Sequence, residues 1–237
     1  MGMFLSLSGV IGRTQDEVRD SLARYAASVD GGLQEAELTT DDKNCCVIQE
    51  SNHNTTVLYP FDYIEWDRSS EFLSKELNAP VFSFHIHDGD LWMYVLYLNG
   101  QVLDQFNPIP DYWDDGVSES EIQSWKGSAS VVAKHIGLPP AEIEHYLIRW
   151  DLNAEESQKA YDDDEFANED WQLLDFLRKC RLPYPLDDDR NAKGRIYKIW
   201  TKELTLSPEI NTRSGQVKTI SQEKPINQAK PWWKFWG

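Results

Sequence analysis

The chain has 237 residues, of which 41% are hydrophobic and 12% aromatic, a composition that can build a core and excludes an intrinsically disordered protein. Its 23 lysines and arginines against 40 aspartates and glutamates give a formal net charge of −17 at pH 7. The longest apolar runs, such as residues 91–98, are too short to cross a bilayer, and the first residues lack the basic region of a signal peptide. We therefore expect a soluble, cytoplasmic protein with no transmembrane segment.

The first element in chain order is a strand, followed by a helix. Residues 3–12 are rich in strand-forming side chains. Thr14 is suited to cap the helix that follows, because Glu17 stands three residues later, as in a capping box. Apolar residues then recur at helical spacing until Gly31, which favours the end of the helix there.

A hairpin, a second helix and three further strands are expected next. Two β-branched runs, residues 44–50 and 55–60, flank a polar turn and are typical of a hairpin. Residues 67–80 show a helical pattern that ends at a proline. Residues 81–107 contain three apolar runs separated by the dipeptides Asp-Gly and Asn-Gly, which type I′ turns prefer. These three runs predict an antiparallel meander at the centre of the sheet.

The fold class predicted for residues 1–117 is therefore α+β. The order is β-α-β-β-α-β plus two strands, which is the order of a ferredoxin-like antiparallel sheet with its helices on one face. Residues 118–190 are expected to form a helical subdomain packed on this sheet domain, and the chain thus has a helical C-terminal half. Residues 191–237 are interpreted as a basic arm that begins with a strand near 195–206 and ends in an aromatic tail.

The three cysteines and the acidic clusters give no metal or redox signature. Cys45, Cys46 and Cys180 form no C-x-x-C pair, so we expect thiols in a reducing compartment and no cofactor. The acidic runs at residues 161–170 and 186–190 do not match the ligand spacing of an EF-hand, and solvated charge is the interpretation we favour. No nucleophile or nucleotide-binding motif is present in the sequence.

The segment around the Asp-Gly turn is the first candidate site. His85 and His87 stand two apart on a predicted strand and so project from one face, with Asp88 and Asp90 in the turn. Two imidazoles and a carboxylate are ligands for a divalent metal ion, and the histidines could also serve acid–base chemistry. A hairpin with surface histidines explains the same residues without any site, and this is the interpretation we favour.

The loop after the meander is the second candidate site. It combines two aromatic residues with acids, namely Asp111, Tyr112, Trp113, Asp114 and Asp115. Tyrosine and tryptophan anchor protein interfaces, and acids attract cationic partners, so these five residues are predicted to bind a basic protein.

The aromatic tail is the third candidate site. Trp232, Trp233, Phe235 and Trp236 stand within five positions, with lysines beside them. Such a tail suits contact with an anionic membrane surface, insertion into a groove of a partner, or docking on the acidic body of its own chain. We expect the last of these, and keep membrane-surface contact as a weaker alternative.

Residues 1–190 carry most of the negative charge of the chain. They hold 14 Lys and Arg against 37 Asp and Glu, which is −23, whereas residues 191–237 hold 9 against 3, which is +6. An acidic body repels phosphate backbones and attracts basic proteins, so we expect a basic protein partner and no nucleic acid. Acidity that serves only solubility is the alternative.

These features together predict a soluble, acidic, non-enzymatic protein-binding module. Bacterial toxin-immunity proteins are often small, acidic and α+β, and they are a specific version of this prediction by analogy of class alone. The alternative function is a metal-dependent or acid–base enzyme centred on His85, His87, Asp88 and Asp90.

Overall fold

The computed structural model describes residues 3–36, 44–61, 63, 65–114, 116–151 and 157–202. The strands in this range are β1 (Leu5–Val10), β2 (Gly32–Glu35), β3 (Cys45–Ser51), β4 (Asn54–Leu58), β5 (Val81–His87), β6 (Leu91–Leu98), β7 (Gln101–Phe106) and β8 (Arg195–Trp200). The helices are α1 (Gln15–Ser28), α2 (Trp66–Leu77), α3 (Glu119–Ser124), α4 (Ala129–Ile136) and α5 (Gln172–Lys179), with the 3-10 turns η1 (Pro140–Glu142) and η2 (Glu144–Tyr146). The predicted tail and Asp115 lie outside the described residues.

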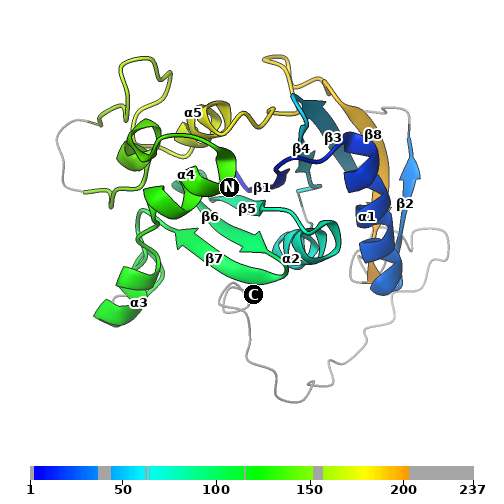
Figure 1. Cartoon of the computed structure of the whole chain (residues 1–237), viewed down its shortest axis with the longest axis horizontal. Helices are drawn as coiled ribbons and strands as arrows, with labels where there is room; N and C mark the ends of the chain where they lie inside the picture. The colour runs from blue at the N-terminus through cyan, green and yellow to red at the C-terminus, as the bar shows by residue number, and fades with distance from the viewer. Residues whose placement is uncertain are drawn as a thin grey trace, which may run out of the picture. The chain divides into compact units, whose positions relative to one another are not determined.

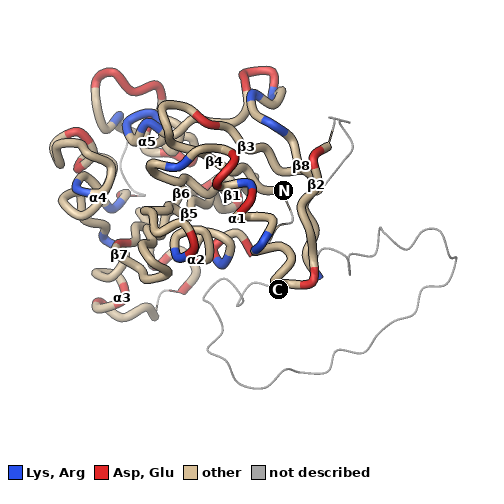
Figure 2. The backbone as a smooth tube through the Cα atoms, turned by 45° about the vertical axis from the view of Figure 1, so that its right-hand side comes forward, with Lys and Arg blue, Asp and Glu red and all other residues tan. Residues whose placement is uncertain are grey.

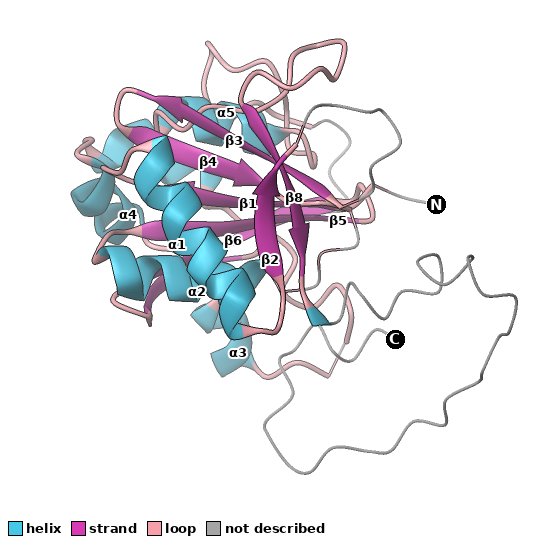
Figure 3. Cartoon of the chain, turned by 90° about the vertical axis from the view of Figure 1, so that its right-hand side faces the viewer, coloured by secondary structure: helices cyan, strands magenta, loops and turns pink. Residues whose placement is uncertain are grey.

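The eight strands form a single antiparallel sheet with the order β2-β8-β3-β4-β1-β5-β6-β7 (Figures 1 and 3). This confirms the α+β class. Within the part of the chain that the structure describes, no helix is long and apolar enough to span a membrane.

The position of the meander differs from the prediction. β5, β6 and β7 are consecutive antiparallel neighbours, as expected, but β7 lies at an edge of the sheet and β1 and β4 occupy the middle. The sheet extends on the other side because β8 pairs with both β3 and β2. The short strand β2 carries no strong pattern of its own, and its pairing partner lies more than 150 residues away in the sequence.

The first helix forms where its capping signals place it. The Thr14 side chain accepts a hydrogen bond from the backbone N–H of Glu17, and the Glu17 carboxylate accepts one from the backbone N–H of Thr14. This reciprocal pair satisfies two donors that the first turn of a helix leaves without partners. The buried side of α1 includes Val18, Leu22 and Tyr25, at the spacing that the sequence predicted.

Helices cover both faces of the sheet, whereas the sequence predicted one covered face (Figure 3). Ser8 of β1 contacts Ser70 of α2 on one face. Phe84 and Tyr94, whose side chains point the other way, contact Phe176 of α5. The physical reason is that β5 and β6 are buried on both sides, so each face of these strands needs a covering layer.

The segment from residue 118 to residue 190 is helical only in short pieces. Its described part holds α3, α4, η1, η2 and α5, which span between three and eight residues each and are joined by loops. A helical C-terminal half is therefore not confirmed. Pro139, Pro140 and Pro183 interrupt the pattern, and the acidic run at residues 162–165 forms turns rather than a helix.

Candidate functional site

The turn between β5 and β6 positions the first group of candidate residues. Asp88 and Gly89 both have positive φ, 53° and 76°, and the backbone N–H of Asp90 donates to the carbonyl of His87 at 3.0 Å. This is the geometry that Asp-Gly favours in a two-residue hairpin turn. The turn holds the two histidines on β5 and brings the two carboxylates to its tip.

His85 is packed between an indole ring and a serine. Its ring stacks on Trp66 with the centroids 4.7 Å apart and an interplanar angle of 4°. Its Nδ1 is hydrogen-bonded to the hydroxyl of Ser6 at 3.0 Å. Burial is the main cause that lowers the pKa of His85, to about 3, and His87 adds to the effect. His85 is therefore neutral at physiological pH and is engaged in packing.

His87 lies nearer the surface, with aromatic edges on two sides. Its ring meets Phe4 and Trp113 nearly at right angles, each with a centroid separation of 5.0 Å. The indole N–H of Trp113 donates to Nε2 of His87 at 3.3 Å. Burial lowers the pKa of His87, and the charges of Asp88 and Asp90 oppose this change.

The two histidines are neighbours, as predicted, with ring centroids 5.7 Å apart. Nδ1 of His85 is hydrogen-bonded to Ser6, and Nε2 of His87 accepts the indole N–H. Among the described residues, no group of three or more His, Cys, Asp or Glu side chains is placed to hold a metal ion.

The loop after β7 folds back onto the tip of the β5–β6 hairpin. An ion pair of 2.5 Å between Asp111 and Arg149 holds one end of the loop. The hydroxyl of Tyr112 donates to the carboxylate of Asp90, and Trp113 reaches His87. The structure therefore brings the two candidate sites of the sequence, which are more than 20 residues apart, into one place.

We call the combined region the hairpin-tip surface, and it consists of Phe4, Phe61, His87, Asp88, Asp90, Tyr112, Trp113 and Asp114. The two phenylalanine rings pack edge to face with their centroids 5.9 Å apart. The side chain of Phe61 is 60% exposed and that of Tyr112 is 37% exposed. The sequence did not indicate either phenylalanine, because nothing in the local pattern links them to the hairpin.

The carboxylates of the hairpin-tip surface have no basic neighbour among the residues that the structure describes. Asp88, Asp90 and Asp114 are exposed, and no lysine or arginine of the described chain lies within ion-pair distance of them. Figure 2 shows further acidic positions concentrated in loops of the described fold. Among the described residues, the local charge is thus negative and without an ion-pair partner, beside exposed aromatic rings.

The acidic run before α5 has a structural role. Arg178 bonds with Asp163 at 2.9 Å, with Asp164 at 2.9 Å and with Asp175 at 3.3 Å. Hydrogen bonds from Arg178 and Lys179 lower the pKa of Asp163 to about 2. Within the described residues these carboxylates are neutralised by the chain itself, in contrast to those of the hairpin-tip surface.

Sequence reasoning also missed a buried carboxyl group under the second helix. Asp67 lies in the first turn of α2, and its Oδ1 has no hydrogen-bond partner among the described residues. Burial raises the pKa of Asp67 to about 7, against smaller opposing contributions from Arg68. A helix position that the sequence marks only as polar gives no signal of this burial.

Comparison with models of protein families, with curated proteins and with solved structures finds no match for this chain. Its function is therefore inferred from the site.

Proposed function

We propose that this chain is a non-enzymatic binding protein whose hairpin-tip surface engages a basic segment of a protein partner. The observation that carries the proposal is the pairing of exposed aromatic rings with exposed carboxylates that have no basic neighbour in the described chain. Phe61 and Tyr112 offer apolar area, and Asp88, Asp90 and Asp114 offer negative charge. Aromatic anchors beside charges that attract the partner are typical of a protein interface.

The anchoring of the loop within this surface supports the same function. Tyr112 is bonded to Asp90, Trp113 is bonded to His87, and Asp111 is paired with Arg149. A surface held in this way loses little conformational freedom when a partner binds, which favours affinity. The net charge of −17 would speed the approach of a cationic partner and disfavour nucleic acid.

A narrower form of the proposal is a protein resembling the immunity proteins that neutralise bacterial toxins in the cytoplasm. The four strands β3, β4, β1 and β5 lie in this order in the sheet, and this order supports a ferredoxin-like core within the larger sheet. The narrower form rests on fold class and acidity, and it would require a basic toxin as the partner.

The competing function is a metal-dependent or acid–base enzyme centred on His85, His87, Asp88 and Asp90. The side-by-side imidazoles are the feature in its favour. The stacking of His85 on Trp66 and the bond from Trp113 to His87 favour packing roles instead. Elemental analysis of the purified protein separates the two: about one equivalent of a transition metal, lost in His87→Ala, would support the enzyme.

The binding function is tested with matched bait proteins in extracts of the native host. We expect Asp88→Asn/Asp90→Asn to lose a basic protein that the wild-type chain captures. The control is Asp162→Asn/Asp189→Asn, which changes the net charge equally at two exposed acids elsewhere. Capture of the same proteins by both double variants would contradict the proposal.

Two further measurements refine this test. Tyr112→Phe removes the bond to Asp90 but leaves the charges, so it separates loop anchoring from charge.

With the captured protein purified, its association rate should fall steeply with added salt, because the screening length shrinks from about 10 Å at 0.1 M to about 3 Å at 1 M. A rate that does not change over this range would rule out charge attraction as the mechanism.

A further inference from the structure

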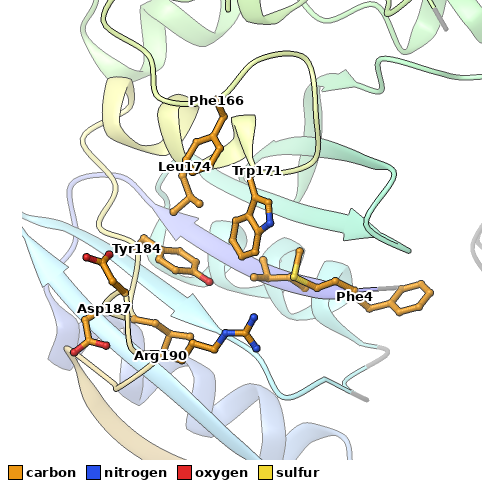
Figure 4. A pocket seen from close by; sticks show the side chains of 11 residues that line it. Phe4, Phe166, Trp171, Leu174, Tyr184, Asp187 and Arg190 are labelled. Carbon is orange, nitrogen blue, oxygen red and sulfur yellow. The ribbon is translucent and has the colours of Figure 1, made fainter. Parts of the chain in front are cut away.

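A groove of about 390 Å³ opens on the α5 side of the sheet, at the start of β1 (Figure 4). Its walls are Met3 and Leu5 from the start of the chain, Phe166, Trp171 and Leu174 from the region of α5, and Tyr184 and Leu186 from the segment before β8. The ring of Phe4 points away from this groove, toward the hairpin-tip surface. The volume lies in the range of small-molecule sites, roughly 300–1,000 Å³.

Three hydrogen-bond donors line this apolar groove. They are the guanidinium of Arg190, the hydroxyl of Tyr184 and the indole N–H of Trp171, and Figure 4 shows the Arg190 side chain extended along the groove below the other two. Within the described chain, none of the three is bonded to another residue. Burial raises the pKa of Tyr184, so its hydroxyl stays protonated and can donate.

The turn that carries Arg190 is closed by its own hydrogen bonds. The backbone N–H of Arg190 donates to the carbonyl of Asp187 at 2.9 Å, and Leu186 pairs with Ala192 across the turn. The carboxylate of Asp187 accepts from the backbone N–H and the side-chain amide of Asn191, at 2.7 Å and 3.1 Å. Asp187 is thus committed to the turn and forms no ion pair with Arg190.

The charge pattern of the groove selects the ligand. An arginine fork binds a carboxylate through two parallel hydrogen bonds, and the flat rings of Trp171 and Tyr184 suit a flat apolar body. A polyanion is disfavoured because Arg190 is the one cation among the described lining residues, and Asp187 and Asp188 also line the groove. A single carboxylate is the anion that one guanidinium can pair with in full.

We infer that this groove is a binding site for a small aromatic monocarboxylate. The carboxylate meets the guanidinium of Arg190 and the hydroxyl of Tyr184, and the aromatic body lies against Trp171 and Phe166. This site adjoins the hairpin-tip surface, because the Phe4 residue lines both, but it requires no particular protein partner.

Calorimetric titration of the full chain with indole-3-propionate and with 3-phenylpropionate tests the inference. We expect saturable binding of at least one acid, and binding weaker by roughly tenfold or more for the corresponding neutral amide, since a charge-assisted pair is lost. Arg190→Gln should weaken the binding of the acid by a similar factor. Arg195→Gln is the matched control, because it removes one exposed arginine outside the groove, and it should bind as the wild type does.

The position of the bound ligand is checked by the indole N–H resonance of Trp171, assigned through Trp171→Phe. We expect this resonance to shift on titration in the wild type and in Arg195→Gln. Equal affinity for acid and amide, unchanged binding in Arg190→Gln, a Trp171 resonance that does not move, or no binding of either acid would each overturn the inference. None of these outcomes bears on the capture of a protein partner, so the two proposals fail independently.

Discussion

The two faces of the sheet are built from alternate residues of the same strands, and both bury apolar side chains, but they differ in the polar groups that they bury. On the face covered by α5, aromatic rings meet: Phe82 and Phe84 contact Tyr94 and Phe176 with centroids 5.1–6.3 Å from their neighbours. On the face covered by α2, an apolar cluster includes Leu22, Val57 and Leu73, and Tyr59 of this cluster belongs to a network of bonded hydroxyl groups. Ser8 is bonded to Tyr59 at 2.7 Å and to Ser70 at 2.6 Å, and Ser69 donates to Tyr59 at 2.7 Å.

The two faces should therefore respond to substitution for different reasons. Removing a buried ring costs stability mainly through the cavity that is left, whereas removing one partner of a buried hydrogen-bond network leaves another polar group unsatisfied. The titratable groups Asp67 and His85 also lie on the α2 side, so this side should contribute to the pH dependence of stability. The four predictions below test this contrast.

The largest loss of stability is expected on the aromatic face. Phe84→Ala removes a fully buried ring and leaves a cavity, which typically costs about 3–5 kcal/mol of unfolding free energy. Urea denaturation measures it. The control Phe61→Ala, at a ring that is 60% exposed, should change stability far less. Equal losses in the two variants would show that the α5 layer is not a tight core.

Asp67 should make the α2 face sensitive to pH. Its pKa is raised from 3.8 to about 7, so the folded state binds a proton that the unfolded state releases, and stability falls as the pH rises through this interval. The loss amounts to at most about 4 kcal/mol, at about 1.36 kcal/mol per pKa unit. The change in unfolding free energy caused by Asp67→Asn should therefore be more favourable near pH 8 than near pH 4. Urea denaturation of the variant and of the wild type at both pH values measures this change.

The control for this pH dependence is Asp162→Asn, at an exposed acid in the loop before α5. Its effect on stability should be the same near pH 4 and near pH 8. Contributions from His85 and other groups cancel, because each variant is compared with the wild type at the same pH. If Asp67→Asn shifts stability equally at both values, the carboxyl of Asp67 is not held in its protonated form.

The costs of breaking two partners in the hydroxyl network should be less than additive. Ser8→Ala leaves Tyr59 and Ser70 short of a buried partner and should cost about 1–3 kcal/mol. The double variant Ser8→Ala/Tyr59→Phe should lose less unfolding free energy than the sum of the two single variants. The reason is that the bond between Ser8 and Tyr59 is counted in both single changes but can be lost only once. Ser157→Ala, at an exposed serine, is the control. Strict additivity would contradict a coupled network.

The smallest effect is expected at the turn between β6 and β7, beside α2. Gly100 has a φ of 73°, and a β carbon there would lie 3.3 Å from that of Lys75. Gly100→Val should cost about 1–2 kcal/mol, because a β-branched residue resists this conformation. Gln101→Val, at the exposed start of β7, should be close to neutral, since valine suits a strand. A neutral Gly100→Val would mean that the turn can change its type.

The sequence by itself determined the local elements of this protein. The capping box of Thr14 and Glu17 set the start of α1, and the Asp-Gly and Asn-Gly dipeptides set the two turns of the meander. These signals act between residues that are neighbours in the chain, so their outcome does not depend on distant parts of the fold. The side-by-side placement of His85 and His87 followed from strand alternation alone.

Only the tertiary structure decided which of these elements meet. The insertion of β8 between β2 and β3, the second covered face, the bond from Trp113 to His87 and the groove around Arg190 all join segments that are distant in the sequence. Such contacts form because apolar faces of helices and strands are buried against one another and buried polar groups are hydrogen-bonded. Many different pairings of the elements are compatible with the same sequence pattern, so the pattern does not select one of them. The hairpin and the aromatic loop of the hairpin-tip surface could thus be predicted from the sequence. The contact between them could not, because it depends on the packing of the whole sheet.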